Sequence, residues 1–279
     1  LCVFRGGFSR DAAHIIAQLG LRTLQNLVNR SFVTADNGRY NIHELLRQFG
    51  WEQLQRLSNA GELYSAHSNY YLSWLAQLEA DIKGQRQVES MREIRRDFNN
   101  VQLAWTWAIQ TRQTTDVEQA LETIFVFSYI SGRVVESLDL LQRALDGWAS
   151  MQADYALLLS RIRARMYSLK IFSQLQELEL AQIEHCAAVA RQHQATFQTA
   201  FAVQVLANYY LSIERDNTRA IQLLNDSLST MQALDETYYI ASICHQLGYC
   251  HGQETGLDDF LRFTEMAYQV AKESGNLYR

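Results

Sequence analysis

The spacing of apolar residues predicts two short helices at the start of the chain. Apolar side chains recur every three or four positions across residues 12–19 and again across residues 21–28, which places them on one face of a helix in each run. Ser9 precedes the first run and is a typical N-cap residue, and Gly20 separates the two runs. We therefore expect two amphipathic helices that each pack through one face.

The pattern then changes to that of a β-hairpin. β-forming residues occupy 32–34 and 39–42, and Asn37-Gly38 lies between them. Asn-Gly favours the positive φ angles of a tight type I′ turn, so this is the only β element that we predict. A helix over about 43–57 follows, and we expect it to bury its apolar residues, which are Leu45, Leu46, Phe49 and Leu54.

Three further helices are predicted across residues 61–111. The first carries an apolar stripe over 63–78 and ends at a polar break around Gly84. The second covers about 88–97, and the third begins after an N-cap at Asn99 or Asn100 and contains Trp105 and Trp107. A tryptophan-rich helix is far more often part of a core than a platform for stacking nucleic-acid bases, so we expect the tryptophans to be buried.

From about residue 118 onward, helical hairpins recur. The second helix of each hairpin is predicted to begin near Val134, Leu175-Gln176, Thr218 and Leu257. The intervals of about 42, 43 and 39 residues indicate a repeat. A new helix start after Gly275-Asn276 leads us to expect that the array continues past Arg279. An ordinary helical bundle is the alternative.

Two of these units resemble tetratricopeptide repeats (TPRs), in which small residues let paired helices approach. Such residues stand at the expected offsets in Leu206-Ala207-x-x-Tyr210, followed by Ala220, and in Leu247-Gly248-x-x-His251, followed by Ala267. The units are longer than the roughly 34-residue consensus and lack its terminal proline. Proline is absent from the whole chain.

A stacked array of this kind binds ligands in a groove lined by the first helices of its hairpins. Aligning the repeats places Arg165, Gln204 and His245 in one column and Leu169, Asn208 and Tyr249 in the next. We expect the polar, reachable members of these columns to line the groove, and they are Arg165, Gln204, Asn208, His245 and Tyr249. The alternative is that they are solvated helix residues without a ligand.

The first 57 residues have the order helix, helix, hairpin, helix, which is the outline of a winged-helix domain. The second helix carries Arg22, Gln25, Asn26, Asn29 and Arg30, a modest polar set without a basic stripe. DNA recognition requires base-reading side chains flanked by phosphate contacts. We therefore do not expect this chain to bind DNA, although a DNA-binding transcription regulator stays an alternative.

Two segments resemble STAND proteins, the signal-transduction ATPases with numerous domains that are related to NLR immune receptors. Residues 39–50 (Arg-Tyr-Asn-Ile-His-Glu-Leu-Leu-Arg-Gln-Phe-Gly) resemble the end of the STAND winged helix, where Ile42-His43-Glu44 stands in place of a Met-His-Asp motif. A connector found behind that domain in bacterial STAND regulators is matched at His67, Tyr70, Tyr71, Leu72, Gly84, Gln87, Asp97, Asn100 and Ala104 to Ala108.

The resemblance implies a role for this chain in a larger switch. In the family the motif histidine contacts the β-phosphate of ADP in the resting state, which makes His43 a nucleotide sensor. The implied partners are an upstream nucleotide-binding domain that holds ADP or ATP, an inducer bound to the repeats (a peptide, a protein or a small molecule), and further copies of the protein on activation. From the residues alone, His43 could equally cap or pack the helix that it opens.

Composition and motifs limit the chemistry that this chain can perform. No phosphate-binding loop of the form G-x-x-x-x-G-K-[ST] occurs, so we expect no cofactor and no enzymatic activity in this chain. Cys244, Cys250 and the neighbouring histidines do not converge on one helix face, so we expect no metal site. No apolar run approaches the length of a membrane span, and no secretory signal begins the chain, so we expect a cytoplasmic protein without membrane contact.

We therefore predict an all-α protein with one β-hairpin, organised as a winged-helix domain (1–58), a helical connector (59–115) and TPR-like repeats (116–279). The first 58 residues carry a charge of +3 and the remainder −8, which agrees with two different parts. The predicted function is the sensor and regulatory part of a STAND ATPase. A constitutive protein-binding TPR scaffold is the main alternative.

Overall fold

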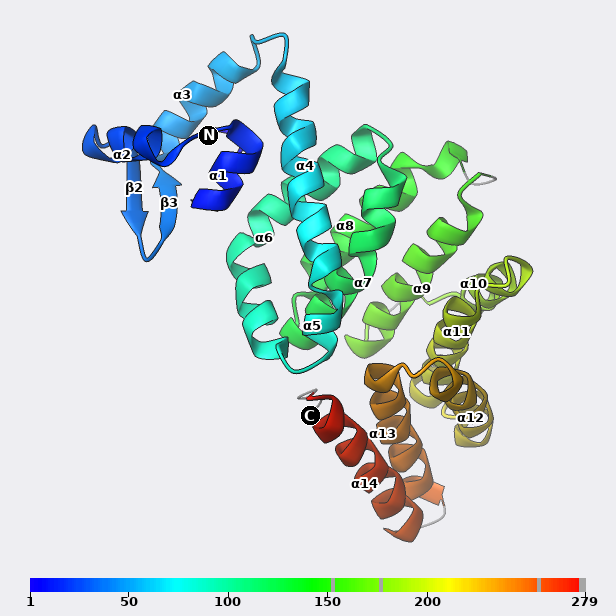
Figure 1. The fold of residues 1–279 in the computed structure, drawn as a ribbon. Coiled ribbons are helices and arrows are strands. Elements are labelled where there is room, and N and C mark those ends of the chain that lie inside the picture. Colours follow the sequence, from blue (N-terminus) through cyan, green and yellow to red (C-terminus); the bar gives the residue numbers. More distant parts are fainter. Residues whose placement is uncertain (152–153, 176–177, 255–256, 276–279) are drawn as a thin grey trace. The chain divides into compact units, whose positions relative to one another are not determined.

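The computed structural model describes residues 1–151, 154–175, 178–254 and 257–275 (Figure 1). The chain packs into two compact units, of which the first comprises residues 1–79 and 89–124 and the second comprises residues 80–88 and the chain from 125 onward. The boundaries predicted at residues 58 and 115 stay predictions. Asn276 to Arg279, on which the predicted continuation of the array rests, lie outside the described residues.

The first unit begins with three short helices and three short strands. In chain order they are β1 (Phe8–Ser9), α1 (Arg10–Ala17), α2 (Leu21–Asn29), β2 (Val33–Asp36), β3 (Arg39–Ile42) and α3 (Glu44–Leu54). Ser9 caps α1 as predicted, since its Oγ accepts a hydrogen bond from the Ala12 amide at 3.0 Å. Whether these elements are a winged helix in the family sense stays a prediction.

The predicted hairpin is present, with Asn37 and Gly38 both at positive φ. The prediction that it is the only β element is wrong, because β1 pairs with β3 and completes an antiparallel sheet of order β1-β3-β2. Phe8 lies opposite Tyr40 in this pairing. A strand of two residues has no periodicity that a sequence pattern could reveal.

Helix α3 differs from its prediction in burial. None of its residues is buried, and Leu45 and Phe49 are 69% and 64% exposed. The expectation that Leu45, Leu46, Phe49 and Leu54 belong to a core is therefore wrong for the described part of the chain. Leu46 and Leu54 are half-buried, so the apolar face of α3 is only partly covered.

The helices after α3 are α4 (Ala60–Gln77), α5 (Glu79–Lys83) and α6 (Gln87–Gln110). The predicted break before Asn99 and Asn100 is wrong, because α6 runs through both residues without interruption. Asn100 bonds to other elements through its side chain instead of capping a helix. The tryptophan prediction is confirmed for Trp105, which is fully buried. Trp107 is only half-buried, and its ring stacks on that of Tyr64 with ring centroids 4.9 Å apart.

Four successive helical hairpins follow, so the predicted TPR-like all-α fold is confirmed. Their helices are α7 (Thr114–Ser131), α8 (Val134–Gly147), α9 (Ala156–Phe172), α10 (Leu180–Gln192), α11 (Thr196–Tyr209), α12 (Asn217–Ala233), α13 (Thr237–Glu254) and α14 (Leu257–Ser274), with a 3-10 turn at Ala149–Met151 and a π-helical turn, η2, at Tyr210–Glu214. The predicted starts of α8, α12 and α14 agree to within one residue. Helix α10 begins at Leu180 rather than near Leu175, and Gln176 lies outside the described residues.

Small residues allow the close helix pairing that the repeat requires. Ala207 and Ala220 are completely buried, and a Cβ on Gly248 would lie 3.2 Å from Thr264 Oγ1 of the paired helix. Such contacts let each hairpin bury its apolar face against its neighbours. Among the described helices, none combines the length and the apolar character that a membrane crossing requires.

Candidate functional sites

The second unit contains a cavity of about 730 Å³ that is lined by the first helices of all four hairpins. Helices α7, α9, α11 and α13 contribute its walls, together with η2 and the described ends of the loop after α9. Its apolar lining residues are Tyr129, Ile171, Phe172, Leu175, Leu178, Leu211, Ile213 and Tyr249, and its polar ones are Ser168, Gln174, Asn208, Ser212, Arg215 and Gln246. This size and this mixture of side chains are typical of a ligand site.

A second cavity of about 20 Å³ adjoins the first, since both are lined by Tyr129, Ser168, Asn208 and Gln246. Its volume suffices for about one water molecule. Gln204 lines it and is 5% exposed. The Gln204 amide nitrogen donates to Ser242 Oγ at 3.3 Å and to Gln246 Oε1 at 3.2 Å, whereas its Oε1 atom is buried without a partner.

A change of helix type shapes one wall of the larger cavity. Helix α11 passes directly into η2, which contributes Leu211, Ser212 and Ile213 to the lining. The turn ends at Arg215, whose φ of 58° is left-handed. π-Helical turns are rare and occur frequently at functional sites. This segment contains neither Gly nor Pro, and we find no sequence signal that predicts the turn.

Three of the five predicted groove residues lie at these cavities. Asn208 and Tyr249 line the larger one, and Gln204 lines the smaller one. Sequence reasoning missed Gln246 and Arg215, which also line the larger cavity. Gln246 is one residue from the predicted His245, so a shift of one position along α13 would have found it.

Arg165 is the clearest correction. It is completely buried, so the prediction that it is reachable from the groove is wrong. Its guanidinium lies 4.7 Å from the ring centroid of Phe201 and donates to the Arg161 carbonyl oxygen at 3.1 Å and to Gln198 Oε1 at 3.0 Å. Aromatic faces and carbonyl oxygens compensate a buried cation, so Arg165 joins α9 to α11 from within the core.

The other two column residues also lie away from the cavities. Leu169 is completely buried like Arg165, because both lie on the inward face of α9, whereas Ser168 and Phe172 face the cavity. His245 is exposed, and it is not among the described residues that line either cavity.

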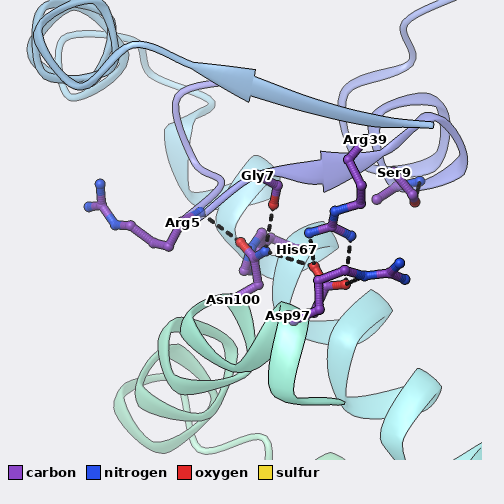
Figure 2. A network of polar contacts seen from close by, with 9 residues as sticks. Arg5, Gly7, Ser9, Arg39, His67, Asp97 and Asn100 are labelled. Atoms are coloured by element: carbon purple, nitrogen blue, oxygen red, sulfur yellow. Dashed lines mark hydrogen bonds and ion pairs between the residues drawn. The ribbon is translucent and has the colours of Figure 1, made fainter. Parts of the chain in front are cut away.

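The first unit contains a network of polar contacts that fastens its sheet to α6 (Figure 2). Arg39 in β3 donates two hydrogen bonds to the Asp97 carboxylate, at 2.7 and 2.8 Å. Asn100 donates to the Gly7 carbonyl oxygen at 2.9 Å and accepts from the Arg5 amide at 2.7 Å. Asp97 and Asn100 belong to the predicted connector motif, and the structure gives them the role of holding the N-terminal segment.

His67, from the same motif, is 1% exposed and lies 3.3 Å from Asn100 Oδ1 through its Nε2 atom. Burial lowers its pKa to about 4, against a smaller upward effect of the bond to Asn100. The imidazole is therefore neutral near pH 7, so its Nε2 can donate to the amide oxygen.

His43, the predicted nucleotide sensor, is exposed at the start of α3. Its Nδ1 atom accepts a hydrogen bond from the Leu45 amide at 3.3 Å, so it caps the helix. The exposed Leu45 and Phe49 lie on the same helix. The capping role is compatible with the predicted sensor role, because the cap engages only one of the two ring nitrogens.

The cysteine and histidine residues of α13 do not form a metal site in the described part of the chain. No group of three or more metal-ligating side chains lies together among the described residues. Cys244 and Cys250 are buried, and His251 stacks on Phe263 with ring centroids 5.1 Å apart. Burial raises the pKa of the Cys244 thiol to about 11, which keeps it protonated near neutral pH.

No family model and no curated protein matches this chain. Among solved structures, its fold is similar to that of the Signal Transduction ATPase with Numerous Domains (STAND) protein with a tetratricopeptide repeat sensor from Pyrococcus horikoshii, with a TM-score of 0.52 and 11% sequence identity. The match covers 99% of this chain and 44% of that one, so this chain spans less than half the length of the similar protein. At this identity the likeness shows the fold alone.

Proposed function

We propose that this chain is the sensor and regulatory part of a STAND-type nucleotide switch in the cytoplasm. The observation that carries the proposal is the cavity lined by the first helices of all four hairpins, in a chain whose fold is similar along 99% of its length to a STAND protein with a repeat sensor. The repeats supply a place for an inducer, and the N-terminal elements supply a surface for a regulated domain.

The surface of α3 supports the second part of this proposal. Leu45 and Phe49 expose their apolar side chains on the helix that His43 caps, and exposed apolar side chains grouped on one element are typical of a contact surface. We assign this surface to a nucleotide-binding domain, with the free ring nitrogen of His43 directed to the β-phosphate of ADP. That domain holds the nucleotide, and this chain performs no hydrolysis.

The polar network supports a mechanical link between the sheet and the following helices. The Arg39–Asp97 pair and the contacts of Asn100 hold β3 and the N-terminal loop against α6. A displacement of α6 is thereby passed to the sheet and α3. An inducer that binds the open arrangement more tightly than the closed one shifts the population towards the open state, which exchanges ADP for ATP and oligomerises.

The test uses the longest natural polypeptide that contains this chain, loaded with a fluorescent ADP. We expect His43→Ala to raise the rate of ADP release several-fold, because one contact of the closed state is lost. His14→Ala is the matched control, since His14 is also exposed and lies on α1. If the His43 and His14 variants release ADP at the wild-type rate, the sensor role is wrong.

A second pair of variants tests the apolar surface. Leu45→Glu and Phe49→Glu should leave the stability of this chain unchanged, because neither side chain is buried, and should raise ADP release in the longer polypeptide. In a constitutive protein-binding scaffold, these substitutions would leave the rate of ADP release unchanged.

A DNA titration at two salt concentrations tests the alternative of a DNA-binding regulator. We expect no measurable affinity for DNA near physiological salt.

A further inference from the structure

The larger cavity has one charged side chain among its described lining residues, and that side chain is Arg215. The rest of the described lining is aromatic, aliphatic, hydroxyl or amide. A cavity with such a lining and a volume of about 730 Å³ accommodates a small organic molecule. Its positive charge favours a negatively charged group beside the wall that η2 contributes.

Arg215 is free to bind an anion. Arg215 is exposed, and its guanidinium has no hydrogen-bond or ion-pair partner in the described part of the chain. The acidic residues beside it in sequence are engaged elsewhere and do not line the cavity. Glu214 accepts a hydrogen bond from Tyr209 Oη at 3.1 Å, and Asp216 caps α12 by accepting from the Arg219 amide at 3.0 Å.

Gln204 independently indicates that the ligand carries a hydrogen-bond donor. Its Oε1 atom is a buried acceptor without a partner, next to a cavity that shares four lining residues with the larger one. An unsatisfied buried acceptor is costly, and a ligand N–H that reached it would remove the cost. Gln204 and Arg215 thus favour two different groups on one ligand, a hydrogen-bond donor for Gln204 Oε1 and an anion for Arg215.

We propose that the cavity binds a small organic carboxylate with an aromatic or aliphatic body and an N–H donor. The carboxylate pairs with Arg215, the body packs between Tyr129, Phe172 and Tyr249, and the N–H bonds to Gln204 Oε1. This inference rests on the proposed function, because it names the chemical class of the inducer.

The test measures binding of matched small molecules to this chain by calorimetry. The probes are indole-3-acetic acid, its primary amide and the amine tryptamine, with naphthalene-1-acetic acid as an isosteric acid that lacks the N–H. We expect the acids to bind severalfold more tightly than the amide and the amine, because a charge-assisted hydrogen bond is stronger than a neutral one and the exposure of Arg215 keeps its contribution modest.

The variants assign the two contacts separately. Arg215→Gln should reduce the affinity for both acids severalfold and remove the preference over the amide. Arg143→Gln on helix α8 is the control. Gln204→Leu should weaken indole-3-acetic acid severalfold and leave naphthalene-1-acetic acid unchanged. A thermal melt of each variant establishes that it is folded.

The proposal is wrong if the amine or the amide binds as tightly as the acids, if the acid preference persists in Arg215→Gln, or if no acid binds at millimolar concentration. These outcomes would contradict the ligand class but not the proposed function, because an uncharged inducer could still release ADP. Conversely, acids that bind through Arg215 without changing ADP release in the longer polypeptide would contradict the proposed function and support the ligand class.

Discussion

Arg39 and Asp97 form a two-point ion pair, 58 residues apart in sequence, between the central strand of the N-terminal sheet and helix α6. Their side chains are only 13% and 8% exposed. Breaking such a pair leaves a charge without a partner in a poorly solvated place, which costs more than the pair contributes as a whole.

Asp97→Asn should therefore lower the free energy of unfolding of the first unit by about 3 kcal/mol, measured by denaturant titration with tryptophan fluorescence. Asp139→Asn is the matched control. Its partner Arg143 and Asp139 itself are both more than half exposed, so the loss there should be below about 1 kcal/mol. Equal losses of stability in the two variants would show that burial does not make the loss of the Arg39–Asp97 pair more costly than the loss of an exposed pair.

The buried imidazole of His67 predicts a dependence of stability on pH. Its pKa is about 4 in the folded chain and about 6.5 when unfolded, so between these values the unfolded state binds more protons. The free energy of unfolding therefore rises with pH through this window, and this increase is complete above about pH 6.5. We expect the His67 contribution, of roughly 3 kcal/mol, to disappear as the pH falls to 4.

His67→Gln is the variant that isolates this effect, because it keeps a donor for Asn100 and does not titrate. The difference between wild type and variant should change across pH 4 to 6.5 and stay constant above it. Parallel curves for the two proteins would exclude the assignment.

Gly7 is required by both its backbone angle and its surroundings. Its φ is 93°, and a Cβ would lie 2.2 Å from Asn41 Oδ1. Gly7→Ala should destabilise the first unit by about 2 kcal/mol or more, since strain and the clash add. Gly38→Ala meets no atom within 4 Å at a similar φ of 76°, so it should cost only about 1 kcal/mol. Thermal unfolding of both variants distinguishes the two contributions.

Substitution of Arg165 should lower stability, whereas substitution of Asn208 should weaken ligand binding. Arg165→Ala removes a fully buried side chain together with its hydrogen bonds to Arg161 and Gln198, and we expect a loss of about 3 kcal/mol in stability. Asn208→Ala at the cavity wall should change stability by no more than about 0.5 kcal/mol and should weaken binding of the carboxylate probes. A stable Arg165→Ala variant would contradict its structural role.

The sequence by itself determined the helical hairpins, the Asn37-Gly38 turn and the Ser9 cap. These depend on short-range periodicity, on allowed backbone angles and on local hydrogen bonds, all of which can be read within a few residues. The small residues at Ala207 and Gly248 likewise predicted close helix pairs, because their size is a local property that tertiary packing then uses.

Only the tertiary structure decided which faces of those helices are buried. Arg165 and Gln204 look alike as polar residues on the first helices of their hairpins, yet one is enclosed between aromatic rings and the other reaches a cavity. The pattern of Leu45 and Phe49 predicted a buried face, and the fold leaves it exposed. Periodicity shows that a helix face is apolar, whereas the partner that covers this face is set by segments distant in sequence.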